Sequence, residues 1–304
     1  MPHFRFHTLD VFTTQPYTGN PLAVILEADG LNDAQMQTIA REFNLSETVF
    51  VHKATRADAL AKLRIFTPAK EMPFAGHPTV GTACLLADLY LSQSGSELDF
   101  VLEENVGPVP VKVRRSGACP PFAQLSVAKL PEYGPPPPPV KQLALMLGLP
   151  AQEIVTETER PRAASCGVPF LLVPVRDTAA LSRIRVDTAR CREVLRDYPV
   201  RDIYLYAHDA EHGDAHIRAR MFAPELGIAE DPATGAASVA LAGALALEHS
   251  MRDGTLRWTI EQGVEMARPS LLYTEADKQA GRVTAVRVGG HAVRVAEGQV
   301  WVPG

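Results

Sequence analysis

Two short motifs contain the residue types that proton-transfer chemistry uses. A Gly-His-Pro motif at 76–78 and an Asp-Pro-Ala-Thr-Gly motif at 231–235 each precede a run of small and apolar residues. Because both runs are expected to be helices, the free N–H groups and the positive dipole end at each start favour a bound carboxylate. We therefore predict that His77 and Asp231 lie beside a substrate carboxylate. The alternative is that either residue is an ordinary N-terminal cap.

A third candidate is Glu47, in the expected strand Leu-Ser-Glu-Thr-Val-Phe-Val at 45–51. Residues two apart on a strand share a face, which places Glu47 on the same side as Leu45, Val49 and Val51. Burial there would raise the pKa of the carboxyl group, and a carboxyl that titrates near neutral pH can accept and return a proton. The alternative is a glutamate that faces outward or pairs with an arginine or lysine, and the pattern alone favours that alternative.

A zinc site would be a competing chemistry. The His-Asp-Ala-Glu-His segment at 208–212 fits an H-x-x-E-H pattern, and His216 follows four residues later. Zinc binding by this pattern needs a helix that presents both histidines on one face. The segment instead lies between two expected strands and is followed by Gly213. We therefore predict a hairpin tip and no metal.

Cysteine catalysis is a second competitor, since a two-base racemase can use thiolates at two facing helix starts. Those positions are Ala75 and Asp231 in this sequence. Cys84 is expected two turns inside its helix, in the core, and Cys166 has no counterpart at the repeated position. No C-x-x-C pair is present, so free thiols of a cytoplasmic protein are expected at all four cysteines: Cys84, Cys119, Cys166 and Cys191.

Composition sets the broad class. The 304 residues are long for one domain and fit two of about 150 residues each. Hydrophobic residues make up 46%, which predicts a buried core, and the net charge of −5 without a basic stripe argues against nucleic acid as a partner. The start of the chain has no apolar signal-peptide region, and no stretch is apolar enough to span a membrane. Neither a G-x-G-x-x-G nor a Walker A motif is present, so no nucleotide cofactor is expected.

The sequence contains an internal repeat. Arg-Ile-Phe-Thr-Pro at 64–68 matches Arg-Met-Phe-Ala-Pro at 220–224, which is 156 residues later (220 − 64). Two further blocks keep the same order: 98–106 with 256–264, at an offset of 158 (256 − 98), and 19–25 with 167–173, at an offset of 148 (167 − 19). Such a long period indicates two similar lobes from a duplicated ancestor rather than a solenoid.

The lobes are predicted at 1–132 and 141–285, joined by a stiff proline-rich linker at 133–140. The duplication predicts that the two motif loops face each other across a pseudo-twofold axis, so that both helix starts point into one cleft. The tail at 283–304 alternates in polarity and is predicted to be a hairpin that turns at Gly289-Gly290 and could pack back on the first lobe.

Hydrophobic spacing and turn residues predict the other elements. Helices are expected at 32–44, with Asn32 or Asp33 as the cap, at 77–91, with Pro78 at the first position, and at 234–250. Strands are expected at 22–28, 45–53, 60–67, 97–104, 109–115, 202–208 and 215–222. The fold class is α+β, and the Ala/Gly-rich helix of each lobe suggests a helix wrapped closely by sheet.

The motifs together resemble the PhzF family of phenazine-biosynthesis isomerases and their relatives. The resemblance covers essentially the whole chain, including the segments at 10–25, 45–51, 64–83 and 227–241. It implies two pseudo-symmetric lobes, each a mostly antiparallel sheet rolled around a central helix, as in diaminopimelate epimerase and proline racemase. It also implies a homodimer.

The resemblance assigns roles to particular residues. It implies that Glu47 is the acid/base of a cofactor-independent isomerase that moves a proton between carbons of 2,3-dihydro-3-hydroxyanthranilate or a related carboxylate. His77 and Asp231 would support it, and substrate contacts are expected at seven positions: Asn20, Ser46, Gly76, Pro78, Thr234, Gly235 and Ala236.

One departure from the family pattern concerns Ala236, where the family often has a serine that binds substrate. Loss of that hydroxyl puts the phenazine substrate in doubt. The alternatives are a catalytically silent small-molecule binder that keeps the same site and, with less support, a two-base racemase or epimerase.

Overall fold

The structure, a computed structural model, describes residues 1–91, 95–117, 119–210, 213, 215–226 and 228–302. It is an α+β protein built mostly of strands, as the sequence predicts. The chain divides into two compact units: unit 1 comprises Met1–Ser126 with Gly289–Gly304, and unit 2 comprises Val127–Val288. The lobe boundaries expected from the sequence, at 1–132 and 141–285, stay predictions. No helix among the described residues is long and apolar enough to cross a membrane.

Unit 1 is a sheet with two main helices. Its strands are β1 (His3–Val11), β2 (Asn20–Ile25), β3 (Glu47–His52), β4 (Ala59–Phe66), β5 (Glu71–Met72), β6 (Glu97–Glu104), β7 (Gly107–Arg114) and β8 (Phe122–Ser126). Its helices are α1 (Asp33–Phe43) and α2 (Gly76–Tyr90), with a short 3-10 turn at Ala28–Gly30. β1–β2, β3–β4, β6–β7 and β7–β8 pair antiparallel, whereas β2–β3 and β4–β6 pair parallel.

Unit 2 contains β9 (Glu132–Tyr133), β10 (Arg162–Ser165), β11 (Pro169–Pro174), β12 (Ile203–Ala207), β13 (Ile217–Ala223), β14 (Ile228–Asp231), β15 (Gly254–Gln262) and β16 (Ser270–Gln279). Its helices are α3 (Val140–Leu147), α4 (Thr178–Arg183), α5 (Thr188–Val194) and α6 (Gly235–Glu248). Three 3-10 turns cover Ala151–Glu153, Pro224–Leu226 and Val264–Met266, and the last strand, β17 (Arg282–Trp301), begins in this unit.

Strand pairing in unit 2 repeats that of unit 1. β10–β11, β12–β13 and β15–β16 pair antiparallel, and β11–β12 and β13–β15 pair parallel. Each of these pairings has a counterpart in unit 1 when the matched sequence blocks are superimposed. The prediction of two similar lobes is therefore confirmed, because a shared sequence pattern has produced the same sheet order twice.

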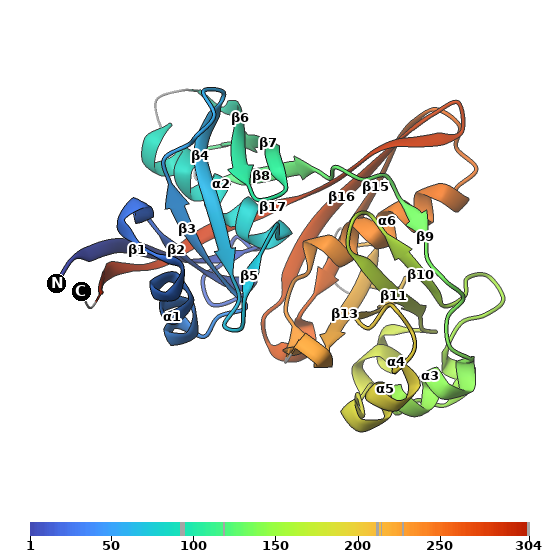
Figure 1. Cartoon of the computed structure of the whole chain (residues 1–304). Coiled ribbons are helices and arrows are strands. Elements are labelled where there is room, and N and C mark those ends of the chain that lie inside the picture. The colour runs from blue at the N-terminus through green and yellow to red at the C-terminus, as the bar shows by residue number, and fades with distance from the viewer. Residues whose placement is uncertain (92–94, 118, 211–212, 214, 227, 303–304) are drawn as a thin grey trace. The chain divides into compact units, whose positions relative to one another are not determined.

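One apolar helix forms the centre of each unit (Figure 1). α2 contacts β1, β2, β3, β7 and β8, and every residue from Gly76 to Ala87 is buried. α6 contacts β10, β11, β15 and β16 in the same way. Small residues permit this close packing: a Cβ on Gly81 would lie 2.6 Å from a Val11 methyl carbon, and one on Gly243 would lie 2.6 Å from Pro131 Cβ. A helix without a polar face must be covered on all sides.

Helix α1 begins where its local sequence predicts. Asn32 is the N-cap, its side chain accepts a hydrogen bond from the Gln35 N–H, and the Gln35 side chain accepts one from the Asn32 N–H. This capping box satisfies two of the donors that a helix start leaves free. The prediction for the second helix is wrong in one detail, because α2 begins at Gly76 and Pro78 is its third residue.

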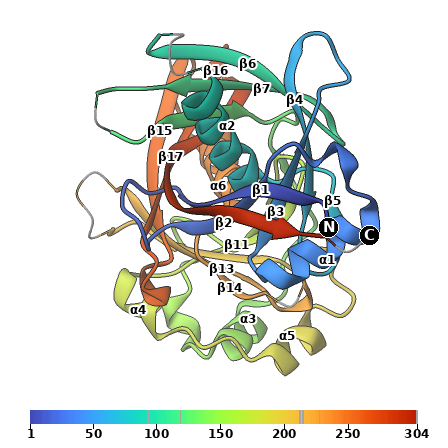
Figure 2. The ribbon, with the colours of Figure 1, turned by 90° about the vertical axis from the view of Figure 1, so that its left-hand side faces the viewer.

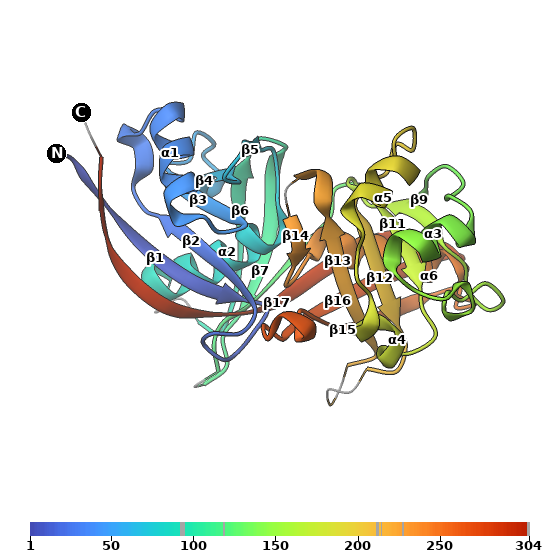
Figure 3. The same cartoon turned by 90° about the horizontal axis from the view of Figure 1, so that it is seen from below.

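The predicted hairpin at the C-terminus is also wrong. β17 runs unbroken through Gly289 and Gly290 and pairs antiparallel with β1, from Trp301 opposite His3 to Ala292 opposite Val11. The start of β1 and the end of β17 therefore lie side by side (Figures 2 and 3). The glycines serve close packing rather than a turn. A Cβ on Gly289 would lie 2.7 Å from the Ala123 carbonyl oxygen, and one on Gly290 would lie 2.3 Å from the Phe12 ring.

Candidate active site

Glu47 and His77 are brought together in unit 1. Glu47 is the first residue of β3, opposite Leu22 on β2, and His77 is the second residue of α2. Glu47 Oε2 lies 3.2 Å from His77 Nδ1, and their side chains are 16% and 5% exposed. Residues 30 positions apart in the chain therefore place a carboxylate against a buried imidazole.

The electrostatics make His77 a neutral partner. Burial lowers the pKa of His77 to about 3, although a hydrogen bond to the Pro21 carbonyl acts in the opposite direction. The 3.2 Å contact with Glu47 is consequently one between a carboxyl group and an uncharged ring. Its second ring nitrogen, Nε2, is buried and has no hydrogen-bond partner among the described residues.

The start of α2 is not capped by a side chain. Its N-cap is Ala75, in extended conformation and without a capping hydrogen bond, and His77 lies inside the helix. The alternative that His77 is an ordinary cap is therefore wrong. Of the other expected contacts in unit 1, Gly76 opens α2, Asn20 begins β2 and is fully buried, and Ser46 precedes Glu47 and is half-buried.

Asp231 belongs to a polar cluster in unit 2. It ends β14, opposite Met221, and is 8% exposed. The Thr234 hydroxyl donates a short hydrogen bond to Asp231 Oδ2. Thr234 is the N-cap of α6, and its side chain makes no cap hydrogen bond. Gly235 and Ala236 are the first two residues of α6.

Gln262 completes that cluster and was missed by the sequence analysis. Its Nε2 donates to the Asp231 carbonyl oxygen at 2.8 Å and to Thr234 Oγ1 at 3.1 Å. Its Oε1 accepts from the Thr234 N–H at 3.1 Å and from the Tyr204 hydroxyl at 3.2 Å. The sequence does contain a signal for it. Gln262 lies in the repeated block at 256–264, where it matches Glu104 in the block at 98–106 of unit 1.

The repeated Arg-x-Phe segment has the same structure in both units. Arg64 donates two hydrogen bonds to Glu71, at 2.7 and 2.6 Å, and Arg220 donates two to Glu230, both at 2.8 Å. Each guanidinium lies over the phenylalanine two residues later, at 5.2 Å for Arg64 and 4.9 Å for Arg220. Bidentate geometry fixes the short strand after each segment.

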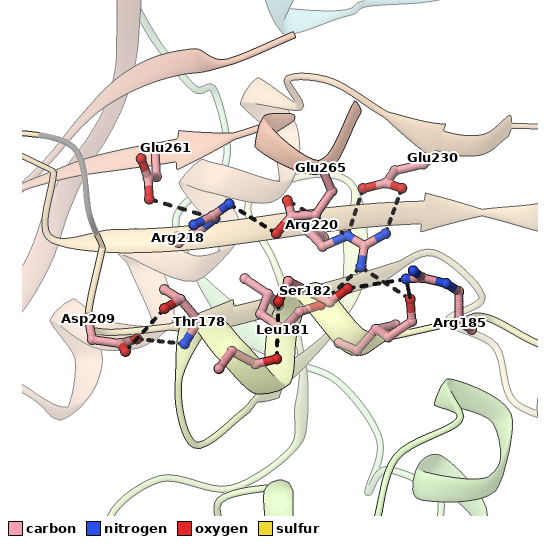
Figure 4. Close-up of polar contacts among 12 residues, drawn as sticks. Thr178, Leu181, Ser182, Arg185, Asp209, Arg218, Arg220, Glu230, Glu261 and Glu265 are labelled. Atoms are coloured by element: carbon pink, nitrogen blue, oxygen red, sulfur yellow. Dashed lines mark hydrogen bonds and ion pairs between the residues drawn. The ribbon is translucent and has the colours of Figure 1, made fainter. Parts of the chain in front are cut away.

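Around Arg220 the cluster is larger (Figure 4). Its Nη1 donates to the carbonyl oxygens of Leu181 and Ile184, at 2.9 and 3.2 Å, which lie at the end of α4. Arg218, on the same strand, lies 3.2 Å from Glu265 Oε1 and 3.8 Å from Glu261 Oε1. Each of these buried guanidinium groups therefore has carboxylates around it.

The two competing chemistries find no support in the described residues. Burial raises the pKa of the Cys84 thiol and raises that of Cys166 to about 12, which disfavours the thiolate that catalysis needs. All four cysteines are free thiols. Residues 211–212 and 214 of the H-x-x-E-H segment lie outside the described residues, and no group of three or more possible metal ligands occurs in the part of the chain that is described.

Comparison with known proteins shows the family to which the chain belongs. The profile of the PhzC-PhzF family, described as phenazine biosynthesis-like protein, matches residues 9–298. The chain belongs to this family. A protein of Mesorhizobium japonicum named as an uncharacterized isomerase is 43% identical over 96% of this chain and 97% of its own length. The trans-2,3-dihydro-3-hydroxyanthranilate isomerase of Pseudomonas aeruginosa is 35% identical over 98% of this chain and 99% of its own.

Solved structures agree as well. A PhzF-family protein from Bacillus anthracis matches with a TM-score of 0.89 and 26% identity, over 99% of this chain and 100% of that one. A hydroxyproline epimerase from Agrobacterium vitis shares the fold with a TM-score of 0.60 at 15% identity, over 98% of this chain and 92% of that one. The predicted family, the α+β fold class with its racemase-like relatives, and the isomerase class are thereby confirmed. The roles of individual residues stay predictions.

Proposed function

We propose that this protein moves a proton between two carbons of a small carboxylate-bearing substrate, with Glu47 as the acid/base. The observation that carries the proposal is the contact between Glu47 Oε2 and His77 Nδ1, 3.2 Å apart, with a ring that stays uncharged because burial lowers the pKa of His77 to about 3. An ammonium or guanidinium group beside Glu47 would hold its carboxyl group in the charged form. A neutral imidazole can hydrogen-bond to that carboxyl group and still allow it to gain or lose a proton.

The proposed reaction conserves atoms. Glu47 takes a proton from an acidic C–H of the substrate, the double bond shifts by one position, and the same carboxyl group returns a proton to another carbon. The chemistry needs an acid/base group and an electron-withdrawing substrate carboxylate, so the proposal includes no metal and no cofactor. The names of relatives at 35% identity support trans-2,3-dihydro-3-hydroxyanthranilate, or a substrate of similar chemistry, as the first to test.

Substrate carboxylate binding is proposed at the helix starts. The N-cap of α2 is Ala75, which brings no capping side chain, so the N–H groups of its first turn remain available to an anion. In unit 2, the Thr234 hydroxyl donates to Asp231 and makes no cap hydrogen bond to α6. We extend the proposal to Gly76, Gly235 and Ala236 as backbone N–H contacts, to Pro78 as an apolar contact, and to Asn20, Ser46 and Thr234 as polar contacts. Homodimerisation and a cytoplasmic location stay predictions.

The decisive variant is Glu47→Gln, which keeps the side-chain volume and removes the exchangeable proton. Turnover of trans-2,3-dihydro-3-hydroxyanthranilate should fall by roughly 10²–10⁴, the usual contribution of a positioned acid/base. Incorporation of deuterium from solvent into the product should fall in parallel. Binding of anthranilate (2-aminobenzoate), a stable aromatic carboxylate, should survive, because the helix starts are unchanged.

The matched control is Asp202→Asn. In unit 1, Leu22 on β2 lies opposite Glu47 on β3. In unit 2 the equivalent strands, β11 and β12, pair Leu171 with Ile203, so Asp202 occupies the position that Glu47 has in unit 1. Asp202→Asn should leave turnover unchanged. Normal turnover in Glu47→Gln, or loss of exchange in Asp202→Asn, contradicts the proposal. Binding of anthranilate by the wild type without any exchange of the substrate would instead favour the silent binder, which the alanine at 236 also allows.

A further inference from the structure

Glu104 is a buried carboxyl group beside the first turn of α2. It is the last residue of β6 and is 4% exposed. Thr79 Oγ1 lies 2.7 Å from Glu104 Oε1 and also 2.7 Å from the Ala75 carbonyl oxygen. A hydroxyl group has one hydrogen atom, and a carbonyl oxygen only accepts. Both short contacts can be hydrogen bonds only if Glu104 carries a proton and donates it to Thr79, which donates in turn to Ala75.

The equivalent position of unit 2 is occupied by a residue that is always neutral. In the strand register of unit 1, Lys62 on β4 lies opposite Glu103 on β6. In unit 2, Arg218 on β13 lies opposite Glu261 on β15. Glu103 and Glu261 are therefore equivalent, and so are the residues that follow them, Glu104 and Gln262. Glutamine has the shape of a protonated glutamate. Gln262 binds the start of α6, as Glu104 binds the start of α2. Both units therefore place a neutral hydrogen-bonding group against the first turn of the central helix.

The surroundings of Glu104 favour the neutral form. Burial raises its pKa to about 8. A hydrogen bond donated by Thr79 to the carboxylate would favour the charged form, whereas a bond donated by the carboxylic acid to Thr79 favours the neutral form. No ion pair joins it to a cation among the described residues. Nearby charges have other partners: Glu103 on the same strand accepts from Thr55 and pairs with Lys62 at 3.9 Å. On α2 the neighbouring ionisable group is His77, which faces Glu47 on β3, and on β5 Glu71 is held by Arg64.

We propose that Glu104 works as a protonated carboxylic acid that fixes the first turn of α2 through Thr79, and is thereby a positioning residue for His77. Ionisation would leave two acceptors competing for the one hydrogen of Thr79. It would also place a buried negative charge beside the helix start at which a substrate carboxylate is proposed to bind. This second consequence rests on the function proposed above, whereas the first does not.

The protonation state has a measurable effect on stability. Because the folded pKa of about 8 exceeds the ordinary value of 4.5, the folded protein binds more protons than the unfolded chain between these values. The contribution of Glu104 to the free energy of unfolding is fully present below its ordinary pKa of 4.5 and is lost as the pH rises toward its folded pKa of about 8. Wild-type protein should therefore take up about one proton more on folding in this window than Glu104→Gln does.

The first experiment measures the free energy of unfolding against pH for the wild type, Glu104→Gln and the control Glu103→Gln. Glu104→Gln should lose the downward slope that the wild type has between the two pKa values. Glu103→Gln should keep it, because hydrogen bonds from Thr55 lower the pKa of Glu103 and move its contribution to more acidic pH. Equal slopes in the wild type and Glu104→Gln overturn the proposal. So does failure of Glu104→Gln to fold, since a neutral isostere must be accepted if Glu104 is neutral.

The second experiment measures anthranilate binding on either side of the Glu104 pKa, at about pH 7 and about pH 9. Affinity of the wild type should fall by roughly tenfold, the effect of an interaction worth one pKa unit, whereas Glu104→Gln should show no such fall. A wild-type affinity that is the same at both pH values overturns the positioning role. If anthranilate fails to bind at any pH, the carboxylate site of the proposed function fails, and the positioning role that rests on it fails with it. The unfolding experiment still decides whether Glu104 is protonated.

Discussion

Units 1 and 2 have the same framework but different residues at their helix starts. In both, an arginine on the fourth strand of the repeat binds a carboxylate with two hydrogen bonds and lies over a phenylalanine. The carboxylate–imidazole contact of Glu47 with His77 occurs in unit 1. Unit 2 has Asp202 and Gly235 near the corresponding positions, and places Asp231 and Thr234 at its helix start instead. The residues that build the fold are therefore alike in the two units, whereas those at the helix starts differ.

Substitution of the two repeated arginines should give the largest difference in the free energy of unfolding between the two units. Arg220 is 5% exposed and also binds two backbone carbonyls, whereas Arg64 is 20% exposed and binds Asp33 with its third nitrogen. Arg220→Met should lower the free energy of unfolding by about 3–5 kcal/mol, because Glu230 is left with a buried charge. Arg64→Met should cost about 1–3 kcal/mol. Denaturant unfolding followed by hydrogen exchange in β4 and β13 measures both.

The double variant Arg220→Met with Glu230→Met serves as the control for that comparison. Removing both charges should restore part of the stability, since no uncompensated carboxylate remains. An Arg64 variant that is as damaging as the Arg220 variant would contradict the view that burial sets the difference between the two units.

His77 of unit 1 and His208 of unit 2 should change the stability of the protein with pH in opposite directions. Burial lowers the pKa of His77, so the folded protein binds fewer protons than the unfolded chain between about 3 and 6.5. Its contribution to the free energy of unfolding is present above the unfolded pKa of 6.5 and is lost as the pH falls, by at most ~1.4 kcal/mol per pH unit. His77→Gln should flatten the loss of stability on acidification, as measured by unfolding midpoints.

His208 of unit 2 provides the opposite sign. Its hydrogen bond with Glu159 raises its pKa, so its contribution is present at acidic pH and is lost as the pH rises. The side chain is 52% exposed, and solvent screening makes the effect smaller than that of His77. If His77→Gln shows the same acid sensitivity as the wild type, the ring is charged in the folded state and the neutral-partner argument fails.

The smallest expected effect concerns Ala236, the second residue of α6. Ala236→Ser adds a hydroxyl where a carboxylate is proposed to bind, and one hydrogen bond contributes about 0.5–1.5 kcal/mol. Anthranilate affinity should rise by roughly twofold to tenfold, measured by calorimetry. The control Ala237→Ser, at a fully buried position, should give no gain. Equal affinities in the wild type and Ala236→Ser would remove Ala236 from the proposed contacts.

Much of this protein was determined by local sequence. The capping residue Asn32, the strand at 97–104, the apolar helices and the order of the repeat all follow from short-range patterns, because periodicity and turn chemistry act over a few residues. Family motifs also predicted Glu47, His77 and Asp231 as a group. The resemblance raised the importance of Glu47, since its strand pattern alone favoured a surface role.

Tertiary structure decided what those patterns could not show. The glycines at 289–290 look like a turn, but they lie in a continuous strand because Phe12 and Ala123 leave no room for a Cβ. His77 is neutral because of burial, which depends on strands distant in the chain. Gln262 and Glu104 look like unremarkable polar residues at strand ends. Their roles arise because pairing between strands brings each against the first turn of a helix, and hydrogen bonding depends on such distances in space and not on separation in sequence.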